Sequence, residues 1–162
     1  MRPNSVTNAT TRIIAPSVVY SGMTTALRAI TTVLTNGMST NYLGLKIDAI
    51  PAYNFTASYH PQGVGNGYVL TVANKRIYLA GDTEDIPDMR GLHNIDVAFL
   101  PMNLPFTMTV TNAASAVREF RPAVVYPYHY AGSGSTPGDV NVFKQLVGQD
   151  LGIEVRLRHF EN

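Results

Sequence analysis

Two side chains that could take part in catalysis follow directly on apolar segments of the sequence. Asp82 stands after residues 77–80 in a Gly-Asp-Thr sequence, and His129 stands after residues 123–126 in a Pro-Tyr-His-Tyr sequence. Ligands of layered α/β folds bind at the carboxyl ends of buried strands, and both side-chain types ligate metals. Each also has an ordinary structural explanation. Asp82 could be a turn or capping residue ahead of Pro87, and His129 could be satisfied by backbone groups at a strand end.

His60 is a third candidate metal ligand. Pro61 holds it extended in a loop before the glycine-containing run 63–67, although a lone loop histidine is usually only solvated. His93 and His159 lie in sequence contexts that indicate no role. Because the chain has four histidines and no cysteine, any metal must be held by histidine and carboxylate side chains. The glycine run precedes a strand, so it predicts a tight backbone turn and not a dinucleotide-binding motif.

Composition excludes several classes of function. The 162 residues correspond to one domain, and only 14% are charged, against about 25% in a typical soluble domain. A net charge of +1 offers no attraction to nucleic acid or to an acidic membrane surface. There is no signal-peptide core, no apolar run of about 18 residues and no G-x-S-x-G motif of serine hydrolases. We therefore expect a cytoplasmic protein with no nucleic-acid or membrane partner.

Four apolar segments predict the strands that position the candidate side chains. Residues 68–72 and 76–80 flank a short polar turn, which is typical of a β-hairpin. Residues 95–100 and 123–126 are almost continuously apolar, as expected for strands buried on both faces. Asp82 and His129 would then follow the second and fourth of these strands.

Apolar residues at helical spacing predict two helices. One begins at Thr109 or Thr111 and ends near Phe120, and the other covers residues 139–147. With no internal repeat and no long linker, residues 1–162 form a single mixed α/β domain. Weaker patterns predict strands over 12–15, 18–20, 43–50 (ended by Pro51) and 153–158, a weak helix within 21–40, and a polar tail over 1–11.

The ordered series of motifs resembles the metallo-β-lactamase-fold metal-dependent hydrolases, most of all the branch related to L-ascorbate-6-phosphate lactonase. The series comprises Gly-Tyr-Val-Leu at 67–70, the segment 75–83 ending in Gly-Asp-Thr, the segment 95–108, and Pro-Tyr-His-Tyr at 127–130. The resemblance extends over roughly residues 12–160, and the order of the motifs is more specific than any one of them.

The resemblance implies an α/β, metallo-β-lactamase-like αββα sandwich that binds zinc or another divalent metal such as manganese or iron. It implies that Asp82 bridges two metal ions and that His129 binds the second. The family's H-x-H-x-D-H motif does not occur in this chain. The histidine that follows a Pro-Ala-aromatic sequence in the family is replaced here by Asn54, with His60 as a candidate substitute. We therefore expect the chain to correspond to the C-terminal portion of such an enzyme.

The number of ligands limits the function that the chain can perform alone. A catalytic zinc needs about three protein ligands, and a two-metal site needs about twice as many. Asp82, His129 and His60 could at best serve one ion. One hypothesis is a hydrolase of a small molecule, with Asp82 and His129 as catalytic residues, whose metal site is completed by a partner chain or is non-standard. The alternatives are a non-catalytic domain acting in binding or self-association, and a metal-free binding module.

Self-association is expected on physical grounds. In an αββα sandwich the two halves cover each other's apolar surface, so one portion alone would expose a large apolar patch. This predicts a homodimer or higher oligomer. The substrate is not indicated, because this fold serves lactones, phosphodiesters, thioesters and β-lactams alike.

Overall fold

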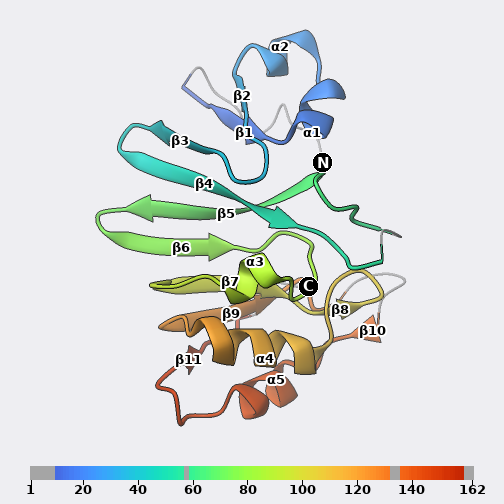
Figure 1. The fold of residues 1–162 in the computed structure, drawn as a ribbon, viewed down its shortest axis with the longest axis vertical. Coiled ribbons are helices and arrows are strands. Elements are labelled where there is room, and N and C mark those ends of the chain that lie inside the picture. The colour runs from blue at the N-terminus through green and yellow to red at the C-terminus, as the bar shows by residue number, and fades with distance from the viewer. Residues whose placement is uncertain (1–9, 57–58, 132–135, 159–162) are drawn as a thin grey trace.

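The computed structural model describes residues 10–56, 59–131 and 136–158 (Figure 1). Its main feature is a seven-stranded sheet. The first four of these strands in chain order pair antiparallel, and the fourth strand and the three that follow it pair parallel. In spatial order the strands are β11 (Glu154–Val155), β9 (Val124–Tyr128), β7 (Val97–Pro101), β6 (Lys75–Leu79), β5 (Gly65–Val72), β4 (Leu45–Ala52) and β3 (Ser39–Tyr42).

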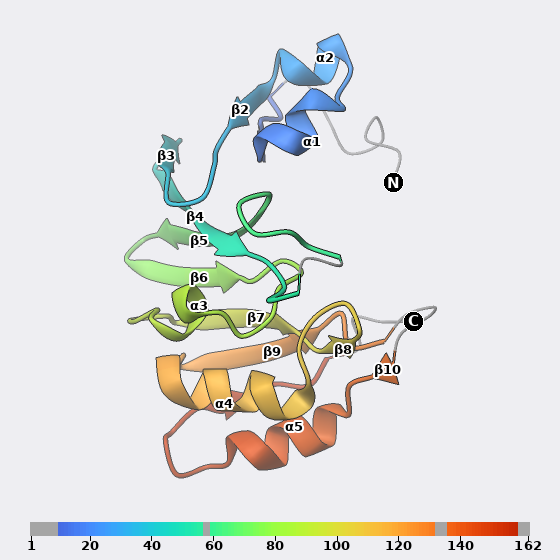
Figure 2. The same ribbon diagram turned by 45° about the vertical axis from the view of Figure 1, so that its right-hand side comes forward.

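Three helices cover one face of this sheet, as Figure 2 shows for the longer two. They are α3 (Pro87–Arg90), α4 (Val110–Phe120) and α5 (Val140–Val147). The main core lies between the helices and the sheet, and its fully buried members come from both: Val69, Tyr78, Ala98, Val125, Ala113, Val117 and Phe143. Burial of these side chains is the main source of the domain's stability.

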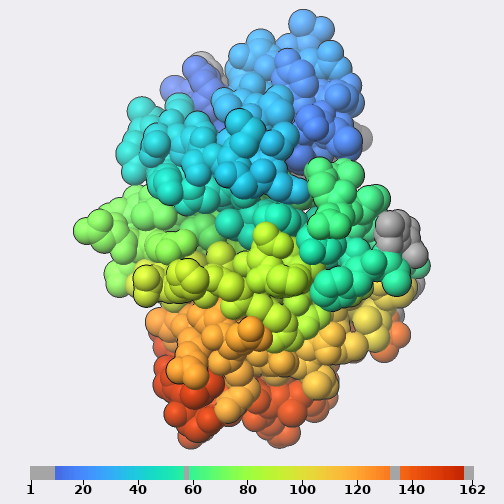
Figure 3. Space-filling view, in the orientation of Figure 1, coloured from blue at the N-terminus to red at the C-terminus, as the bar shows by residue number. Residues whose placement is uncertain are grey.

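A small N-terminal unit lies at the β3–β4 end of the sheet (Figure 3). It packs on the face opposite to the helices, where Ile47 and Ala49 point. It contains the parallel pair β1 (Ile13–Ala15) and β2 (Thr31–Val33), with α1 (Ser17–Ser21) and α2 (Thr25–Arg28) between them. Leu34, Ile47 and Ala49 form its separate apolar cluster. The two remaining strands, β8 (Asn103–Leu104) and β10 (Thr136–Pro137), form a separate antiparallel pair.

The strongest sequence predictions are confirmed. The hairpin of β5 and β6 turns at Ala73 and Asn74, both with positive φ, as a type I′ hairpin turn requires. Helix α4 begins after Thr109, whose hydroxyl accepts a hydrogen bond from the backbone N–H of Asn112. Helix α5 begins after Asp139, which caps it in the same way. None of the helices in the described ranges is long and apolar enough to cross a membrane.

The weaker predictions for the N-terminal region are partly wrong. Residues 18–20 belong to helix α1 and not to a strand, because Pro16 has the extended cap conformation and its carbonyl accepts from the N–H of Tyr20. The helix expected within 21–40 is confined to α2, and the β-branched residues that follow pair with β1 instead. Pro51 does not end its strand but lies opposite Asn66 within β4, and the last strand is shorter than 153–158.

Gly67 allows β5 to approach the end of β6 very closely. A Cβ atom at Gly67 would lie 2.5 Å from the carbonyl oxygen of Ala80 and 2.9 Å from that of Leu79. Both neighbours are backbone atoms, which cannot move aside without shifting a strand. The position of the chain just before Asp82 therefore depends on residue 67 being glycine, which has no side chain.

Replacing Gly67 by alanine is expected to destabilise the fold by about 1–3 kcal/mol, because the added Cβ must displace backbone atoms. Urea unfolding measures the change. Gly22→Ala is the matched control. A Cβ at Gly22 would lie 3.7 Å from the carbonyl oxygen of Val19, an ordinary contact distance, so this substitution should change stability by no more than about 0.5 kcal/mol. Equal effects of the two substitutions would contradict this account.

Candidate metal centre

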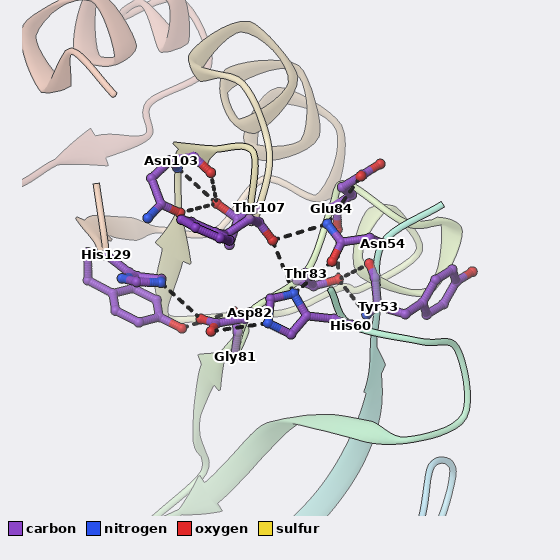
Figure 4. A network of polar contacts seen from close by, with 12 residues as sticks. Tyr53, Asn54, His60, Gly81, Asp82, Thr83, Glu84, Asn103, Thr107 and His129 are labelled. Carbon is purple, nitrogen blue, oxygen red and sulfur yellow. Dashed lines mark hydrogen bonds and ion pairs between the residues drawn. The ribbon is translucent and has the colours of Figure 1, made fainter. Parts of the chain in front are cut away.

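The register of the parallel strands brings Asp82 and His129 together. Leu79 of β6 lies level with Phe99 of β7, which lies level with Tyr126 of β9. Asp82 lies three residues after Leu79, and His129 lies three residues after Tyr126, so both reach the same edge of the sheet. There, Nε2 of His129 lies 3.6 Å from Oδ1 of Asp82 (Figure 4).

His60 approaches the same carboxylate from the other side. It lies in the connection between β4 and β5, and its Nε2 is 3.6 Å from Oδ2 of Asp82. Each carboxylate oxygen of Asp82 thus faces one imidazole. The three side chains remain open to solvent, with exposed fractions of 30% for His60, 36% for His129 and 42% for Asp82.

Asn54 determines which nitrogen of His60 carries the proton. Its amide nitrogen donates to the carboxylate of Glu84 and to the carbonyl of Phe106, both at 3.1 Å, so its oxygen must face His60. Nδ1 of His60 lies 2.7 Å from that oxygen and 3.1 Å from the Phe106 carbonyl, and it must donate because both atoms are acceptors. In the neutral ring, Nε2 therefore presents its lone pair to Asp82.

Thr83 fastens the Asp82 loop to the segment that contains Asn54. Its fully buried hydroxyl accepts from the backbone N–H of Tyr53 at 3.1 Å. The N–H of Glu84 donates to the carbonyl of Tyr53 at 2.9 Å, which adds a second connection. The loop after β6 and the segment after β4 are held together beneath the site (Figure 4).

Tyr128 and the backbone of His129 support the site from β9. The hydroxyl of Tyr128 donates to the carbonyl of Gly81 at 3.0 Å. Burial, with the nearby charge of Asp82, raises the pKa of the Tyr128 phenol, so it stays protonated and remains a donor. His129 has a φ of 47°, a left-handed conformation that is uncommon for residues other than glycine. Such conformations are often found at functional sites.

The donor set fits a metal ion better than a direct hydrogen bond. The 3.6 Å between Nε2 of His60 and the Asp82 carboxylate is too long for a hydrogen bond. It is shorter than the sum of a zinc–nitrogen and a zinc–oxygen bond, about 4 Å, so one ion could contact both atoms. Within the described residues, however, no three His, Asp or Glu side chains are grouped closely enough to hold one ion together. The donors form two half-sites, one on each side of Asp82.

All three candidate residues predicted from the sequence meet at this centre. The sequence analysis missed the roles of Thr83 and Glu84, and it treated Asn54 only as a missing histidine. The sequence signal for Asn54 was a polar residue between the aromatic residues Tyr53 and Phe55, and the structure shows Asn54 to be buried. His93 is exposed, and its carbonyl accepts a hydrogen bond from Arg76. His159 lies outside the described residues.

Comparisons with known proteins identify the family of the chain. The model of the beta-lactamase superfamily domain matches residues 14–129. A protein of Parabacteroides distasonis designated a metal-dependent hydrolase is 42% identical, with a TM-score of 0.84, over 98% of this chain and 69% of that one. Igni18, a metallo hydrolase of Ignicoccus hospitalis, is 26% identical with a TM-score of 0.75, over 91% and 65% of the two chains. The chain belongs to the metallo-β-lactamase-fold metal-dependent hydrolases.

The chain matches only part of its curated relatives. A UPF0173 metal-dependent hydrolase of Thermococcus onnurineus is 38% identical over 125 residues, which are 74% of this chain and 55% of the relative. For the counterpart from Pyrococcus abyssi the values are 33% identity over 150 residues, 89% of this chain and 66% of the relative. The chain thus spans about half to two thirds of the length of these relatives.

Removing the Asn54 side chain should release His60 from its present tautomer. In Asn54→Ala, Nδ1 loses its closest acceptor, so the Nε2-protonated form should become populated in alkaline buffer, and ¹⁵N NMR of the imidazole ring measures the ratio. Asn36→Ala is the control, because Asn36 bonds to Gly65 and Asn66 and not to His60. An unchanged tautomer in Asn54→Ala, or the same change in both variants, would contradict the role of Asn54.

Proposed function

We propose that these residues form one part of a two-metal hydrolase centre, in which Asp82 bridges two ions and His60 and His129 each ligate one. The observation that supports this is the symmetric placement of the two Nε2 atoms, each 3.6 Å from a different oxygen of Asp82. A residue that served one ion alone would not need an imidazole on both sides. Histidine and carboxylate ligands suit zinc, and also manganese or iron.

When bound, divalent ions supply Lewis-acid activation of water and of a carbonyl or phosphoryl oxygen. The chain's own residues prepare the site for this charge. Asp82 contributes a negative charge that no Lys or Arg among the described residues pairs with. Asn54 keeps the Nε2 lone pair of His60 directed toward the centre, and Tyr128 holds the Gly81 carbonyl on the opposite side of the loop.

The remaining ligands must come from elsewhere than the described residues, where no complete set occurs. We propose that a partner chain completes the centre, so that the isolated chain is impaired as an enzyme. The same shortage of ligands favours a second candidate function, a non-catalytic domain that acts in binding or self-association. Metal content distinguishes the two, because only the first requires that Asp82 still holds metal.

Protein purified without a metal-affinity column should contain zinc, manganese or iron by elemental mass spectrometry, or take up zinc on incubation. Asp82→Ala should lower the apparent metal affinity at least tenfold, because it removes a ligand of both ions, and His129→Ala should lower the stoichiometry. His93→Ala, at an exposed histidine away from the centre, should change neither, and circular dichroism verifies that all variants fold. A chain that binds no metal even in excess zinc would refute the two-metal centre.

We also propose that the chain associates with a second copy of itself. Leu79 is 37% exposed, and strand alternation places it on the sheet face opposite to buried Tyr78 and the helices. Light scattering at micromolar concentration should therefore show a dimer or larger species. Leu79→Asp should weaken the association at least tenfold, whereas Leu146→Asp, at a 42% exposed position on α5, should not. A folded wild-type monomer would overturn this proposal.

A further inference from the structure

Asn103 follows the strand that lies between the two strands positioning Asp82 and His129. Strand β7 pairs with β6 on one side and with β9 on the other, and Asn103 begins β8 just after β7 ends at Pro101. Pro101 pairs with Tyr128, the residue before His129, so Asn103 emerges beside His129. In Figure 4 the carboxamide group of Asn103 points to the side of the centre where His129 lies.

The carboxamide of Asn103 is buried with one atom unsatisfied. Its oxygen accepts from the hydroxyl of Thr107 at 2.9 Å, whereas its nitrogen has no hydrogen-bond partner. Within the described ranges, one other buried side-chain polar atom shares this property, the hydroxyl of Tyr78, which belongs to the main core and packs edge-on against Phe120. A buried donor without an acceptor costs about 1–3 kcal/mol. At Asn103 this cost is placed beside the candidate metal centre.

A half-turn of the carboxamide would satisfy its nitrogen at Thr107. The nitrogen would then donate to the Thr107 hydroxyl oxygen, which accepts from the backbone N–H of Asn103 at 2.8 Å and has a second lone pair. The hydrogen of that hydroxyl would go to the carbonyl oxygen of Asn103, 3.0 Å away. Because the oxygen and nitrogen of a carboxamide have nearly the same size, the turn displaces no neighbour. The amide oxygen would then face His129 as an acceptor.

His129 requires an acceptor of this kind when it ligates a metal ion. Its Nε2 faces Asp82, so Nε2 is the atom available to the metal, and the neutral ring then carries its proton on Nδ1. None of the described residues makes a hydrogen bond to Nδ1 of His129. In His60, by contrast, Nδ1 already lies 2.7 Å from the oxygen of Asn54. Metal-binding histidines almost always donate their second ring N–H to such an outer acceptor.

We propose that Asn103 is the positioning residue of His129: when His129 ligates a metal ion, the amide turns its oxygen to the ring and accepts the Nδ1 proton. The inference rests on the proposed two-metal centre, because ligation through Nε2 is what requires the proton on Nδ1. Each half-site then contains an imidazole and an asparagine that orients it, Asn54 for His60 and Asn103 for His129. Both asparagines are almost fully buried, at 3% and 1% exposure, as groups that do not touch the substrate should be.

NMR of the unmodified chain tests the change of orientation, first in EDTA and then after loading with zinc, in alkaline buffer where the imidazoles are neutral. On zinc loading, the nuclear Overhauser effect from the Asn103 side-chain NH₂ protons to the Thr107 side chain should strengthen at least twofold. The Nδ1 proton of His129 should become visible in ¹H–¹⁵N spectra and exchange slowly with water. An unchanged Overhauser effect in a zinc-loaded chain would overturn the inference.

Substitutions of Asn103 separate an acceptor from mere bulk. Asn103→Leu has no acceptor, so it should weaken zinc binding at least tenfold and return the Nδ1 proton of His129 to fast exchange. Asn103→Asp keeps an oxygen acceptor and should bind zinc at least as tightly as the unmodified chain, with slow exchange retained. Asn41→Leu, at an exposed position of the edge strand β3, is the matched control and should change neither quantity. Circular dichroism verifies folding, and the unmodified chain and Asn103→Asp carry the test if Asn103→Leu does not fold.

The two substitutions also distinguish the acceptor from other roles of Asn103. If the NH₂ group acted as a donor to a bound ligand, or if the side chain were only structural, Asn103→Asp would fail as Asn103→Leu does. Equal losses of zinc affinity in the two variants would therefore overturn the inference.

Metal content of the same preparations separates this inference from the proposed function. Zinc uptake that is lost in Asp82→Ala but unaffected by Asn103→Leu would overturn the inference and leave the metal centre in place. A chain that takes up no zinc at all would overturn the metal centre itself, and the inference with it.

Discussion

The alignment of three parallel strands is the constraint on which the candidate centre depends. Because Leu79, Phe99 and Tyr126 lie level across β6, β7 and β9, the residues three positions further on emerge at one edge of the sheet. A slip of one residue would move a strand by about 3.3 Å and turn its side chains to the opposite face. The stacked rings of Phe99 and Tyr126, 5.1 Å apart and inclined by 12°, oppose such a slip.

His60 has no strand to position it and depends instead on a chain of hydrogen bonds. Glu84 and the Phe106 carbonyl orient the amide of Asn54, and that amide orients the ring of His60. Outer groups of this kind commonly determine the tautomer of metal-binding histidines. Asn54 therefore belongs to the candidate centre, and its role there is to orient His60, the candidate ligand six residues later.

Local sequence patterns were sufficient where local physics decides the structure. The hairpin, the buried strands and the caps at Thr109 and Asp139 were predictable, and the strand-end rule was enough to bring Asp82 and His129 together. The rule that β-branched residues favour strands failed at α1, where the single turn closed by Pro16 prevailed. The role of Asn54 was not predictable, because its partners lie as far as 52 residues away in the chain and only the fold brings them together.

The charge pattern distinguishes Asp82 from four of the other aspartates. Asp48, Asp85, Asp96 and Asp150 each have a Lys or Arg nitrogen within 2.5–2.8 Å, and these pairs need no further cation. Asp82 has two imidazoles at 3.6 Å instead, and one of them faces it with a lone pair. A carboxylate placed between such groups is stabilised when a cation joins them. Asp139, which also has no Lys or Arg partner among the described residues, instead caps α5, so the feature that favours metal binding at Asp82 is its pair of imidazoles.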